Sequence, residues 1–464
     1  MSTRPHPHNA PALWARTEAA GQLARRFLLD DRVRFDLSVL ADKSCLAQRD
    51  VLRGASVLLR TETQLASAVG LLELDGLVRR IVLCTSDIEE RFLPAIVSDA
   101  EIASVICDVP ITTPMLASLP CVMIGEPTMP CSRADAALPT EWILFTSGTT
   151  GQPKMVVHTL QSLTGAIPSP TADAAPIVWS TFYDIRRYGG LQILLRSLVG
   201  GGSIVLSSPS EPPNSFLARA ASAGVSHISG TPSHWRRATL SSSIAEFHPS
   251  YVRLSGEAAD QAVLDTLRGI FPSAQVAHAF ASTEAGVAFD VRDGGAGFPV
   301  SLLDEPRGAV EIRVVDGTLR IRSPRRATRY LGAAADPITD ADGFVDTKDI
   351  IEQREGRCYF VGRRDGVINV GGLKVYPEEV EAIINRHPAV HLSLVKSRRS
   401  PIVGAIVVAD VVLSLADGEE SKALEADILA FCRTMLPWHK VPAAIRFVPG
   451  LAVSAAGKLS RRGA

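Results

Sequence analysis

The stretch Phe145-Thr-Ser-Gly-Thr-Thr-Gly-Gln-Pro-Lys154 combines four hydroxyl side chains, two glycines and one lysine at the end of an apolar run. Glycines let backbone amides approach an oxyanion, hydroxyl groups add adjustable donors, and a lysine supplies a cation. The composition is therefore typical of a phosphate-binding loop that follows a buried strand. It does not fit the P-loop pattern GxxxxGK[ST], because Gln-Pro-Lys follows the second glycine. A solvated Ser/Thr turn is the alternative interpretation.

Short β-rich runs alternate with helix-like segments on both sides of this stretch. They include Ile81–Leu83, Ala103–Ile106, Ile143–Phe145, Gly202–Leu206, Val225–Ile228, Val252–Leu254 and Val276–Ala279. This alternation predicts βα units around largely parallel sheets. Farther on, two β-rich runs flank Asp316-Gly317, which is a strong signal for a hairpin and predicts an antiparallel subdomain.

The last hundred residues show a different sequence pattern from the segments before them. The segment VINVGGLKVYPEEVEAIINRHPAV after residue 366 predicts a strand, a Gly-Gly turn and a helix with Pro377 in its first turn, and we expect a helix from Lys422 to Met435 and a strand from Ala444 to Val448. A chain of 464 residues is also too long for one core. We therefore predict an α/β protein with a large N-terminal domain of α/β sheets (residues 1–364) that includes a small antiparallel β subdomain, and a small mobile α+β C-terminal domain (residues 365–464).

Composition narrows the range of functions. Lys and Arg number 48 against 49 acidic residues, so no net field attracts nucleic acid. The seven cysteines contain no CxxC pair, which favours reduced thiols. The opening segment has no apolar core of a signal peptide, and the best apolar stretch, Gly404–Ala416, is broken by Asp410 and too short for a bilayer. We expect a cytoplasmic protein with no membrane span.

The segment from Thr146 to Lys154 resembles the signature of the adenylate-forming superfamily, which includes acyl-CoA synthetases, aryl-acid ligases, peptide-synthetase adenylation domains and firefly luciferase. The likeness continues in further blocks, in the family's order, from about residue 50 to the end. It implies that the loop binds ATP through Thr146, Ser147, Gly148, Thr149, Thr150, Gly151 and Lys154.

Two blocks resemble the family's nucleotide-binding segments. Ala279-Phe-Ala-Ser-Thr-Glu284 implies that Phe280 stacks near adenine, Thr283 touches the α-phosphate and Glu284 holds Mg²⁺. A carboxylate beside a triphosphate suits this hard ion, although Ser-Thr-Glu by itself is more often a helix N-cap. Gly256-Glu257-Ala258 resembles the loop under the adenine.

The C-terminal blocks carry the ribose contacts, the hinge and a lysine. By resemblance, Asp349 accepts the ribose hydroxyls, Arg363 contacts the ribose, Asp365 is the hinge, and Lys458 is the catalytic lysine that bridges the carboxylate and the α-phosphate. A mobile ammonium there would neutralise charge as it develops. The sequence departs from the family at Ala281, Lys348 and Ala452, where Gly, Gly and Pro are usual.

The segment from Thr181 to Gly189 aligns with the family's acid pocket. Arg186 falls on the usual histidine, and Tyr188 and Tyr183 offer aromatic walls. An arginine there offers a planar donor fork for a ring hydroxyl or a carboxylate, while an Arg186 that faces phosphate or solvent is an equal alternative.

The resemblance implies ATP-dependent formation of an acyl-adenylate with release of pyrophosphate, followed by transfer to a thiol. Gly371-Gly372 matches the loop that lines a pantetheine tunnel, so we expect CoA or the phosphopantetheine of an acyl carrier protein as the acceptor; a plain hairpin turn is the alternative. We expect a small aromatic acid such as a hydroxybenzoate. The alternatives are a fatty-acid or dicarboxylic-acid ligase, a luciferase-like oxygenase, a ligand sensor and, on another fold, a P-loop ATPase.

Overall fold

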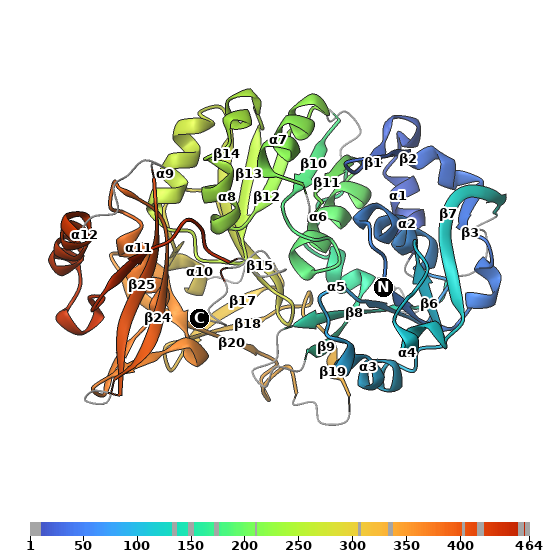
Figure 1. The fold of residues 1–464 in the computed structure, drawn as a ribbon. Coiled ribbons are helices and arrows are strands. Elements are labelled where there is room, and N and C mark those ends of the chain that lie inside the picture. Colours follow the sequence, from blue (N-terminus) through green and yellow to red (C-terminus); the bar gives the residue numbers. More distant parts are fainter. Residues whose placement is uncertain are drawn as a thin grey trace.

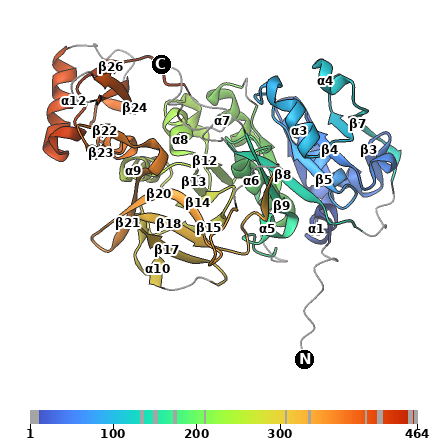
Figure 2. The ribbon, with the colours of Figure 1, turned by 90° about the horizontal axis from the view of Figure 1, so that it is seen from below.

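The computed structural model describes residues 11–131, 137–146, 153–170, 176–208, 211–304, 308–332, 337–400, 404–414, 422–452 and 459. Figures 1 and 2 show the first sheet at one end of the molecule, a second sheet in the middle and the C-terminal strands at the other end. In the described part of the chain, no helix is long and apolar enough to cross a bilayer.

The first sheet has the strand order β19-β9-β8-β5-β4-β6-β7-β3. Its strands are β3 (Lys43–Leu46), β4 (Ser56–Leu59), β5 (Arg80–Leu83), β6 (Ser104–Cys107), β7 (Cys121–Pro130), β8 (Glu141–Thr146), β9 (Lys154–Thr159) and β19 (Arg329–Leu331). The strands from β4 to β8 run parallel, while β9, β19 and β3 are antiparallel additions. Its helices are α2 (Gln64–Leu74), α3 (Leu93–Asp99) and α4 (Pro114–Ala117). The parallel centre agrees with the short, wholly buried runs of the sequence.

The second sheet has the order β15-β14-β13-β12-β10-β11-β1-β2. Its strands are β1 (Phe27–Leu29), β2 (Arg34–Asp36), β10 (Val178–Thr181), β11 (Ser203–Leu206), β12 (His227–Gly230), β13 (Tyr251–Ser255), β14 (Gln275–Ser282) and β15 (Gly286–Val291). The accompanying helices are α1 (Leu13–Ala19), α5 (Leu160–Thr164), α6 (Tyr188–Val199), α7 (Pro213–Ser222), α8 (Pro232–Ala238) and α9 (Gln261–Ile270). The largest core cluster contains residues of α1, α2 and α6 and of both sheets, so these helices hold the two sheets together.

An antiparallel sheet follows, with the order β16-β21-β20-β18-β17. Its elements are β16 (Phe298–Pro299), α10 (Ser301–Asp304), β17 (Glu311–Val315), β18 (Thr318–Arg322), β20 (Val345–Arg354) and β21 (Arg357–Arg363). The turn between β17 and β18 lies at Asp316-Gly317, whose φ angles of 50° and 73° suit an Asp-Gly hairpin. The prediction of an antiparallel subdomain is confirmed.

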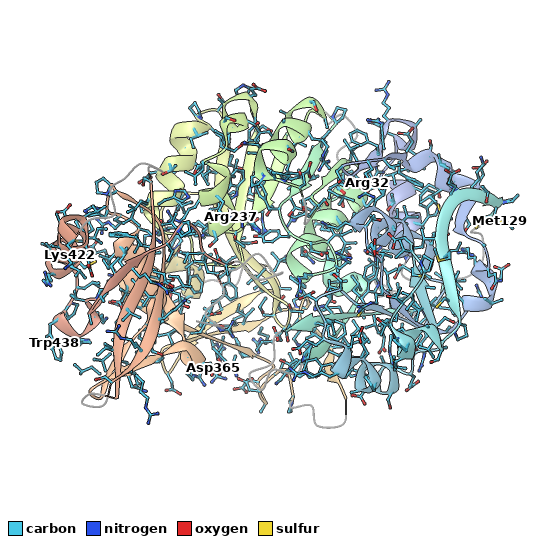
Figure 3. The ribbon with its side chains drawn as sticks, in the orientation of Figure 1. Arg32, Met129, Arg237, Asp365, Lys422 and Trp438 are labelled. Atoms are coloured by element: carbon cyan, nitrogen blue, oxygen red, sulfur yellow. The ribbon has the colours of Figure 1, made fainter. Side chains whose placement is uncertain are left out.

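The C-terminal part forms a separate core in which all the buried residues lie between Ile368 and Ile445. Its elements are β22 (Ile368–Val370), β23 (Leu373–Val375), α11 (Pro377–Ile384), β24 (Val390–Ser400), β25 (Gly404–Leu413), α12 (Lys422–Met435) and β26 (Ile445–Phe447). A short 3-10 helix, η6 (Arg364–Gly366), joins this part to β21, and Figure 3 labels Asp365 at that junction. The predicted fold class is confirmed, and the boundary at residues 364 and 365 stays a prediction.

Candidate active site

The predicted phosphate loop connects β8 to β9, which pair antiparallel. Thr146 ends β8 and is the cross-strand partner of Lys154, the first residue of β9. The Lys154 ammonium lies 5.0 Å from the centre of the Tyr330 ring, which is within the range of a cation–π contact. Five residues predicted to bind ATP lie outside the described residues, namely Ser147, Gly148, Thr149, Thr150 and Gly151.

Tyr330 connects Lys154 to the predicted metal ligand. It belongs to β19, which runs antiparallel to β9 with Tyr330 opposite Val156. Its hydroxyl donates to Glu284 Oε1 at 3.3 Å. A cation, an aromatic ring and a carboxylate thus form one chain of contacts from β9 through β19 to the turn between β14 and β15. Tyr330 was not predicted from the sequence, because nothing local to Arg329–Leu331 indicates pairing with a strand about 170 residues earlier.

His158 positions the backbone of Thr283. The Nε2 atom of His158 lies 2.7 Å from the Thr283 carbonyl oxygen and must donate to it, because a carbonyl only accepts. Nδ1 lies 2.9 Å from the Ser162 hydroxyl, which completes this tautomer. Burial lowers the pKa of His158 to about 4, so the ring is neutral at physiological pH. His158 was also missed, although a lone histidine within an apolar strand was a visible signal.

The predicted adenine loop is connected to two distant segments. Gly256 has a φ of 84°, a conformation that favours glycine, and it follows β13 directly. Glu257 accepts from the backbone amide of Ser233, the second residue of α8, at 3.0 Å. The other oxygen of Glu257 accepts from the backbone amide of Leu459 at 3.2 Å. Lys458 lies outside the described residues, but its neighbour Leu459 is at this loop; a contact of Ala258 with adenine stays a prediction.

The ring of Phe280 is held by other aromatic side chains. It stacks on Phe360 at 5.2 Å with an interplanar angle of 5°, and on Phe289 at 5.7 Å with an angle of 18°. These rings belong to the core of the antiparallel subdomain. The structure thus gives Phe280 a packing role, and its contact with adenine stays a prediction.

The predicted ribose residues face each other across two strands. Asp349 of β20 is the cross-strand partner of Arg363 of β21, so the two side chains start from neighbouring positions of the sheet. Arg363 donates to the Thr347 carbonyl at 3.4 Å. Lys348, where the family usually has glycine, has a φ of 62° and lies 3.2 Å from the Asp365 carboxylate. The predicted ribose site and the predicted hinge are therefore adjacent.

The two tyrosines of the predicted acid pocket are buried. The Tyr183 hydroxyl donates to the Ser255 carbonyl at 2.6 Å, just before the adenine loop. Tyr188 begins α6, and its ring centre lies 5.6 Å from that of His158. Because His158 also binds the Thr283 carbonyl, Tyr188 stands one side chain away from the predicted α-phosphate contact.

Arg186 is paired inside the protein. Its guanidinium donates to both carboxylate oxygens of Asp184, with distances of 2.6 to 3.1 Å, and to the Thr61 carbonyl at 2.6 Å. The Arg186 side chain is only 3% exposed. A buried guanidinium needs acceptors, and the aspartate two residues earlier supplies them. This arrangement argues against the expectation that Arg186 reads a ring hydroxyl. It also differs from the alternative in which Arg186 faces phosphate or solvent, because the guanidinium is buried on Asp184 and the Thr61 carbonyl.

The glycine pair predicted to line the thiol tunnel forms the turn between β22 and β23. Gly371 and Gly372 have φ angles of 56° and 88°, so the turn itself requires glycine-like conformations. No atom lies within 4 Å of a Cβ built on Gly372. The hairpin-turn interpretation is therefore correct locally, and the open surface at Gly372 leaves space for a narrow ligand.

Two protein-family models match the chain. The model of the AMP-binding enzyme family matches residues 55–331, and that of the AMP-binding enzyme C-terminal domain matches residues 379–458. A 2-succinylbenzoate–CoA ligase of Bacillus cytotoxicus is 27% identical over 339 residues, which are 69% of this chain and 68% of the relative. A 3,4-dihydroxybenzoate–[aryl-carrier protein] ligase of Bacillus anthracis is 36% identical over 121 residues, or 26% of this chain and 27% of the relative.

A solved structure of a benzoate CoA ligase from Burkholderia xenovorans LB400 has the same fold, with a TM-score of 0.80 at 20% identity over 97% of this chain and 99% of that one. Together with the relatives, the family models confirm the predicted adenylate-forming superfamily and the predicted enzyme class, an AMP-forming ligase that joins an acid to a thiol. The chain belongs to the AMP-binding enzyme family.

Proposed function

We propose that the protein activates an aromatic carboxylic acid with ATP and passes the acyl group to the thiol of CoA or of a carrier-protein phosphopantetheine. The observation that carries this proposal is the chain of contacts from Lys154 through Tyr330 to Glu284. Thr283, directly before Glu284, is held by His158. A cation, a carboxylate and backbone donors gathered at strand ends suit a triphosphate and the charge that moves across it.

In the first step, a carboxylate oxygen of the acid attacks the α-phosphorus of ATP. A new O–P bond forms, the bond from the α-phosphorus to the bridging oxygen breaks, and pyrophosphate leaves with that electron pair. Lys154 balances charge on the departing phosphates, and Lys458 neutralises the α-phosphoryl oxygens as the acid attacks. Donors to the phosphates come from Thr283 and from the loop residues Thr146, Ser147, Gly148, Thr149, Thr150 and Gly151.

Glu284 is our proposed ligand for Mg²⁺. The residues that the structure describes contain no group of three or more His, Cys, Asp or Glu that could hold a metal ion by themselves. Mg²⁺ is usually bound by one or two carboxylates together with substrate phosphates, so a single carboxylate beside a phosphate loop fits this ion. When bound, the ion would neutralise phosphate charge. The hydrogen bond from Tyr330 orients the carboxylate of Glu284 for this role.

The nucleoside is held, in this proposal, between the second sheet and the antiparallel subdomain. The backbone of Gly256-Glu257-Ala258 and the ring of Phe280 border the adenine. Asp349 accepts hydrogen bonds from the ribose hydroxyls, and its cross-strand partner Arg363 donates to them. Because β20 and β21 lead directly into η6, the ribose contacts are rigidly connected to the hinge at Asp365.

An aromatic acid is favoured by the walls of the pocket. Tyr188 offers a flat, buried ring next to His158, and Tyr183 is fixed behind it by Ser255. Relatives named as ligases of 2-succinylbenzoate and of 3,4-dihydroxybenzoate support the same class. Arg186 holds this segment in place through Asp184 and is not proposed to touch the acid.

In the second step, a thiolate sulfur attacks the acyl carbon of the acyl-adenylate, the C–S bond forms, and the C–O bond to AMP breaks. The thiol proton passes to solvent and AMP leaves. Gly371 and Gly372 border the pantetheine arm, because their turn has no side chain to obstruct it. Rotation about Asp365 brings this turn to the site in place of Lys458.

The test is a screen for acid-dependent pyrophosphate release with ATP and Mg²⁺ over benzoates, cinnamates and fatty acids. We expect AMP as the nucleotide product and thioester formation with CoA or a phosphopantetheinylated carrier protein. Glu284→Gln and Lys154→Met should each lower acid-dependent pyrophosphate release at least about 10²-fold, in line with the loss of one preorganised electrostatic contact. ADP as the product, or release that no aromatic acid stimulates, would contradict the proposal.

A further inference from the structure

A contact between the C-terminal part and the second sheet lies outside the predicted nucleotide and acid sites. Strand β24 contacts helix α8, the helix whose Ser233 amide donates to Glu257. Glu257 also accepts from the amide of Leu459, so the C-terminal part meets α8 and the loop bound to it at two places. Because the residues after Ile368 have a core of their own, such contacts determine how this part is placed on the rest of the protein.

His391 is the extra residue of a β-bulge in β24. Val390 pairs with Leu413 and Leu392 with Val412, so three residues of β24 stand opposite two apolar residues of β25. A bulge bends its strand and redirects a side chain. The imidazole of His391 lies toward the backbone of Arg236 in α8, so it reaches from the C-terminal part to the second sheet.

The His391 ring is partly buried at this contact, and one of its nitrogens is unpaired. Nε2 is buried and has no hydrogen-bond partner among the residues that the structure describes. In a neutral imidazole one nitrogen carries no proton, whereas in an imidazolium both nitrogens are donors. A charged ring would therefore bury a donor without an acceptor, which is costly. The contact suits the neutral form of His391.

The charge of Arg236 also acts against protonation of His391. Arg236 is held in place by an ion pair with Asp260, and only 10% of its side chain is exposed. Burial and then the Arg236 charge lower the pKa of His391, and the Arg236 backbone, which acts in the opposite direction, does not offset them. The next arginine of α8, Arg237, interacts with the charge of Glu257. A proton on His391 would thus place two like charges side by side across the contact.

Acidic groups of the helices that pack near β24 have other partners. Glu381 of α11 accepts from the backbone amide of Val395 at 2.8 Å. Asp427 of α12 lies 3.2 Å from His387 at the start of β24. Neither carboxylate is therefore positioned as the partner of a charged His391.

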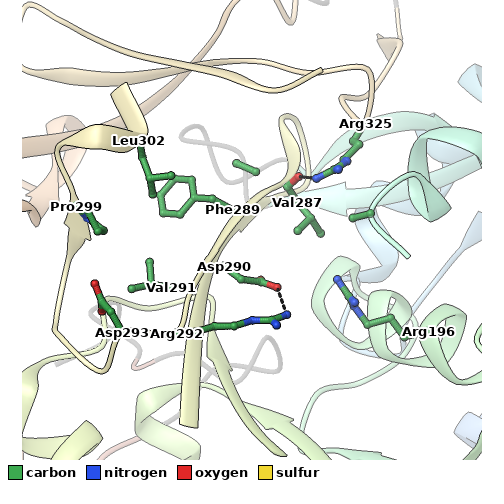
Figure 4. A pocket seen from close by; sticks show the side chains of 12 residues that line it. Arg196, Val287, Phe289, Asp290, Val291, Arg292, Asp293, Pro299, Leu302 and Arg325 are labelled. Carbon is green, nitrogen blue, oxygen red and sulfur yellow. Dashed lines mark hydrogen bonds and ion pairs between the residues drawn. The ribbon is translucent and has the colours of Figure 1, made fainter. Parts of the chain in front are cut away.

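This contact is separate from the pocket along β15. That pocket has a volume of about 560 Å³, and Figure 4 shows Arg196 of α6, residues 287 to 293 and Arg325 around it. Among the described residues that line it, none belongs to α8 or β24. His391 is thus placed to hold two segments of the protein together, not to bind a ligand of that pocket.

We propose that His391 is a positioning residue of the first half-reaction: as a neutral ring it holds the C-terminal part against α8, and a positive charge at this position releases that part for the second half-reaction. This inference rests on the proposed function. His391 acts through α8, whose partner Glu257 binds the residue after Lys458. The ring takes up a proton more readily in water than at the contact, so release is favoured as pH falls and docking as pH rises.

The test uses substitutions that differ in charge, with the most active acid of the screen. His391→Lys keeps a cation beside Arg236 at every pH. Acid-dependent pyrophosphate release should fall at least about fivefold, while thioester formation from synthetic acyl-AMP stays the same or rises, because like charges across an interface disfavour it. His391→Glu offers Arg236 a carboxylate and should slow thioester formation by about the same factor while pyrophosphate release is retained. The matched control is Thr434→Lys, which adds the same charge at an exposed position of α12.

The dependence on pH is read from a neutral variant. His391→Gln has no proton to gain, so its ratio of pyrophosphate release to thioester formation should change less between about pH 7.5 and pH 5.5 than the ratio of the wild type. This comparison and His391→Glu carry the test if His391→Lys fails to fold. Equal pH dependence of the ratio in the wild type and His391→Gln overturns the role of the proton.

Hydrogen exchange reads the contact without an active enzyme. Amides of residues 232–238 and 390–394 should exchange faster in His391→Lys than in the wild type and more slowly in His391→Glu. Equal losses in both half-reactions for the two charged variants, or exchange that does not differ among the three proteins, would contradict the positioning role. Absence of pyrophosphate release with every acid would contradict the proposed function, and exchange shifts of opposite sign would still support the contact.

Discussion

The backbone amide of Leu459 donates a hydrogen bond to Glu257 Oε1 at 3.2 Å, across 202 positions of sequence. The other oxygen of the same carboxylate accepts from Ser233 at the start of α8. One side chain thus connects the predicted adenine loop, a helix of the second sheet and the residue after Lys458. This contact brings Leu459 to the predicted adenine loop, as we propose for the first half-reaction.

Replacing Glu257 should therefore weaken adenylation more than thioester formation. Glu257→Ala removes the acceptor for Leu459, and a hydrogen bond to a charged group contributes about 1.5 to 3 kcal/mol, or roughly 10- to 100-fold. Acid-dependent pyrophosphate release should fall by that factor, while thioester formation from synthetic acyl-AMP falls much less. Glu246→Ala, a change at an exposed residue of the short 3-10 helix that precedes β13, is the control. Equal losses in both half-reactions would contradict a role in holding the C-terminal segment.

Lys458 should serve the first half-reaction alone. One small domain cannot present both Lys458 and the Gly371-Gly372 turn to the same site, so the lysine must leave before the thiol enters. Lys458→Ala should lower pyrophosphate release at least about 10²-fold and leave thioester formation from synthetic acyl-AMP within a few-fold of the wild type. The division of labour is wrong if the second half-reaction falls as far as the overall reaction.

The fold followed from the sequence where the signals were local. The helix Lys422–Met435 and the Asp316-Gly317 hairpin lie where periodicity and turn chemistry indicated, because each is specified by neighbouring residues. The pairing of β19 with β9 could not be predicted, since it joins segments about 170 residues apart.

Likewise, only part of the candidate site could be predicted from the sequence. The phosphate loop was visible from composition, whereas Tyr330 and His158 act through partners that are distant in sequence. The orientation of Arg186 depended on competition between acceptors in three dimensions, which the aligned position did not reveal.

The ion pair between Lys348 and Asp365 should slow movement about the hinge. Both side chains are about half exposed, so the pair contributes at most about 1 kcal/mol to stability and is weakened by salt. Lys348→Asn keeps a residue that tolerates the positive φ of this position and removes the charge. We expect this variant to make thioester faster than the wild type at low salt, by up to about fivefold, and at the same rate at high salt. Identical salt dependence in both proteins would show that the ion pair does not slow movement about the hinge.

Arg186 should matter for stability and not for the choice of acid. Arg186→Met leaves Asp184 without its main partner in a largely buried place, and breaking a buried pair destabilises by about 3 to 5 kcal/mol. Urea unfolding should show this loss, and Arg186→Met/Asp184→Leu should recover part of it because no charge is then left unpaired. The ratio of kcat/KM for hydroxybenzoate over benzoate should stay unchanged. A stable Arg186→Met variant with altered selectivity would contradict this prediction and indicate that Arg186 contacts the acid.

The neutral state of His158 predicts how stability depends on pH. Burial lowers the pKa of His158 from 6.5 to about 4, so between these values the unfolded chain binds a proton that the folded protein does not. Stability therefore rises with pH across this window and is lost as pH falls from 6.5 towards 4; for His158 the loss between pH 7 and pH 5 is about 2 kcal/mol. His158→Gln has no proton to gain and retains an amide donor for the Thr283 carbonyl. Its free energy of unfolding should decline by about 2 kcal/mol less than that of the wild type over the same interval, whatever its stability at pH 7. The exposed His248 gives the control, since His248→Gln should follow the wild type. If all three proteins lose the same free energy between pH 7 and pH 5, His158 is not the buried neutral group that positions Thr283.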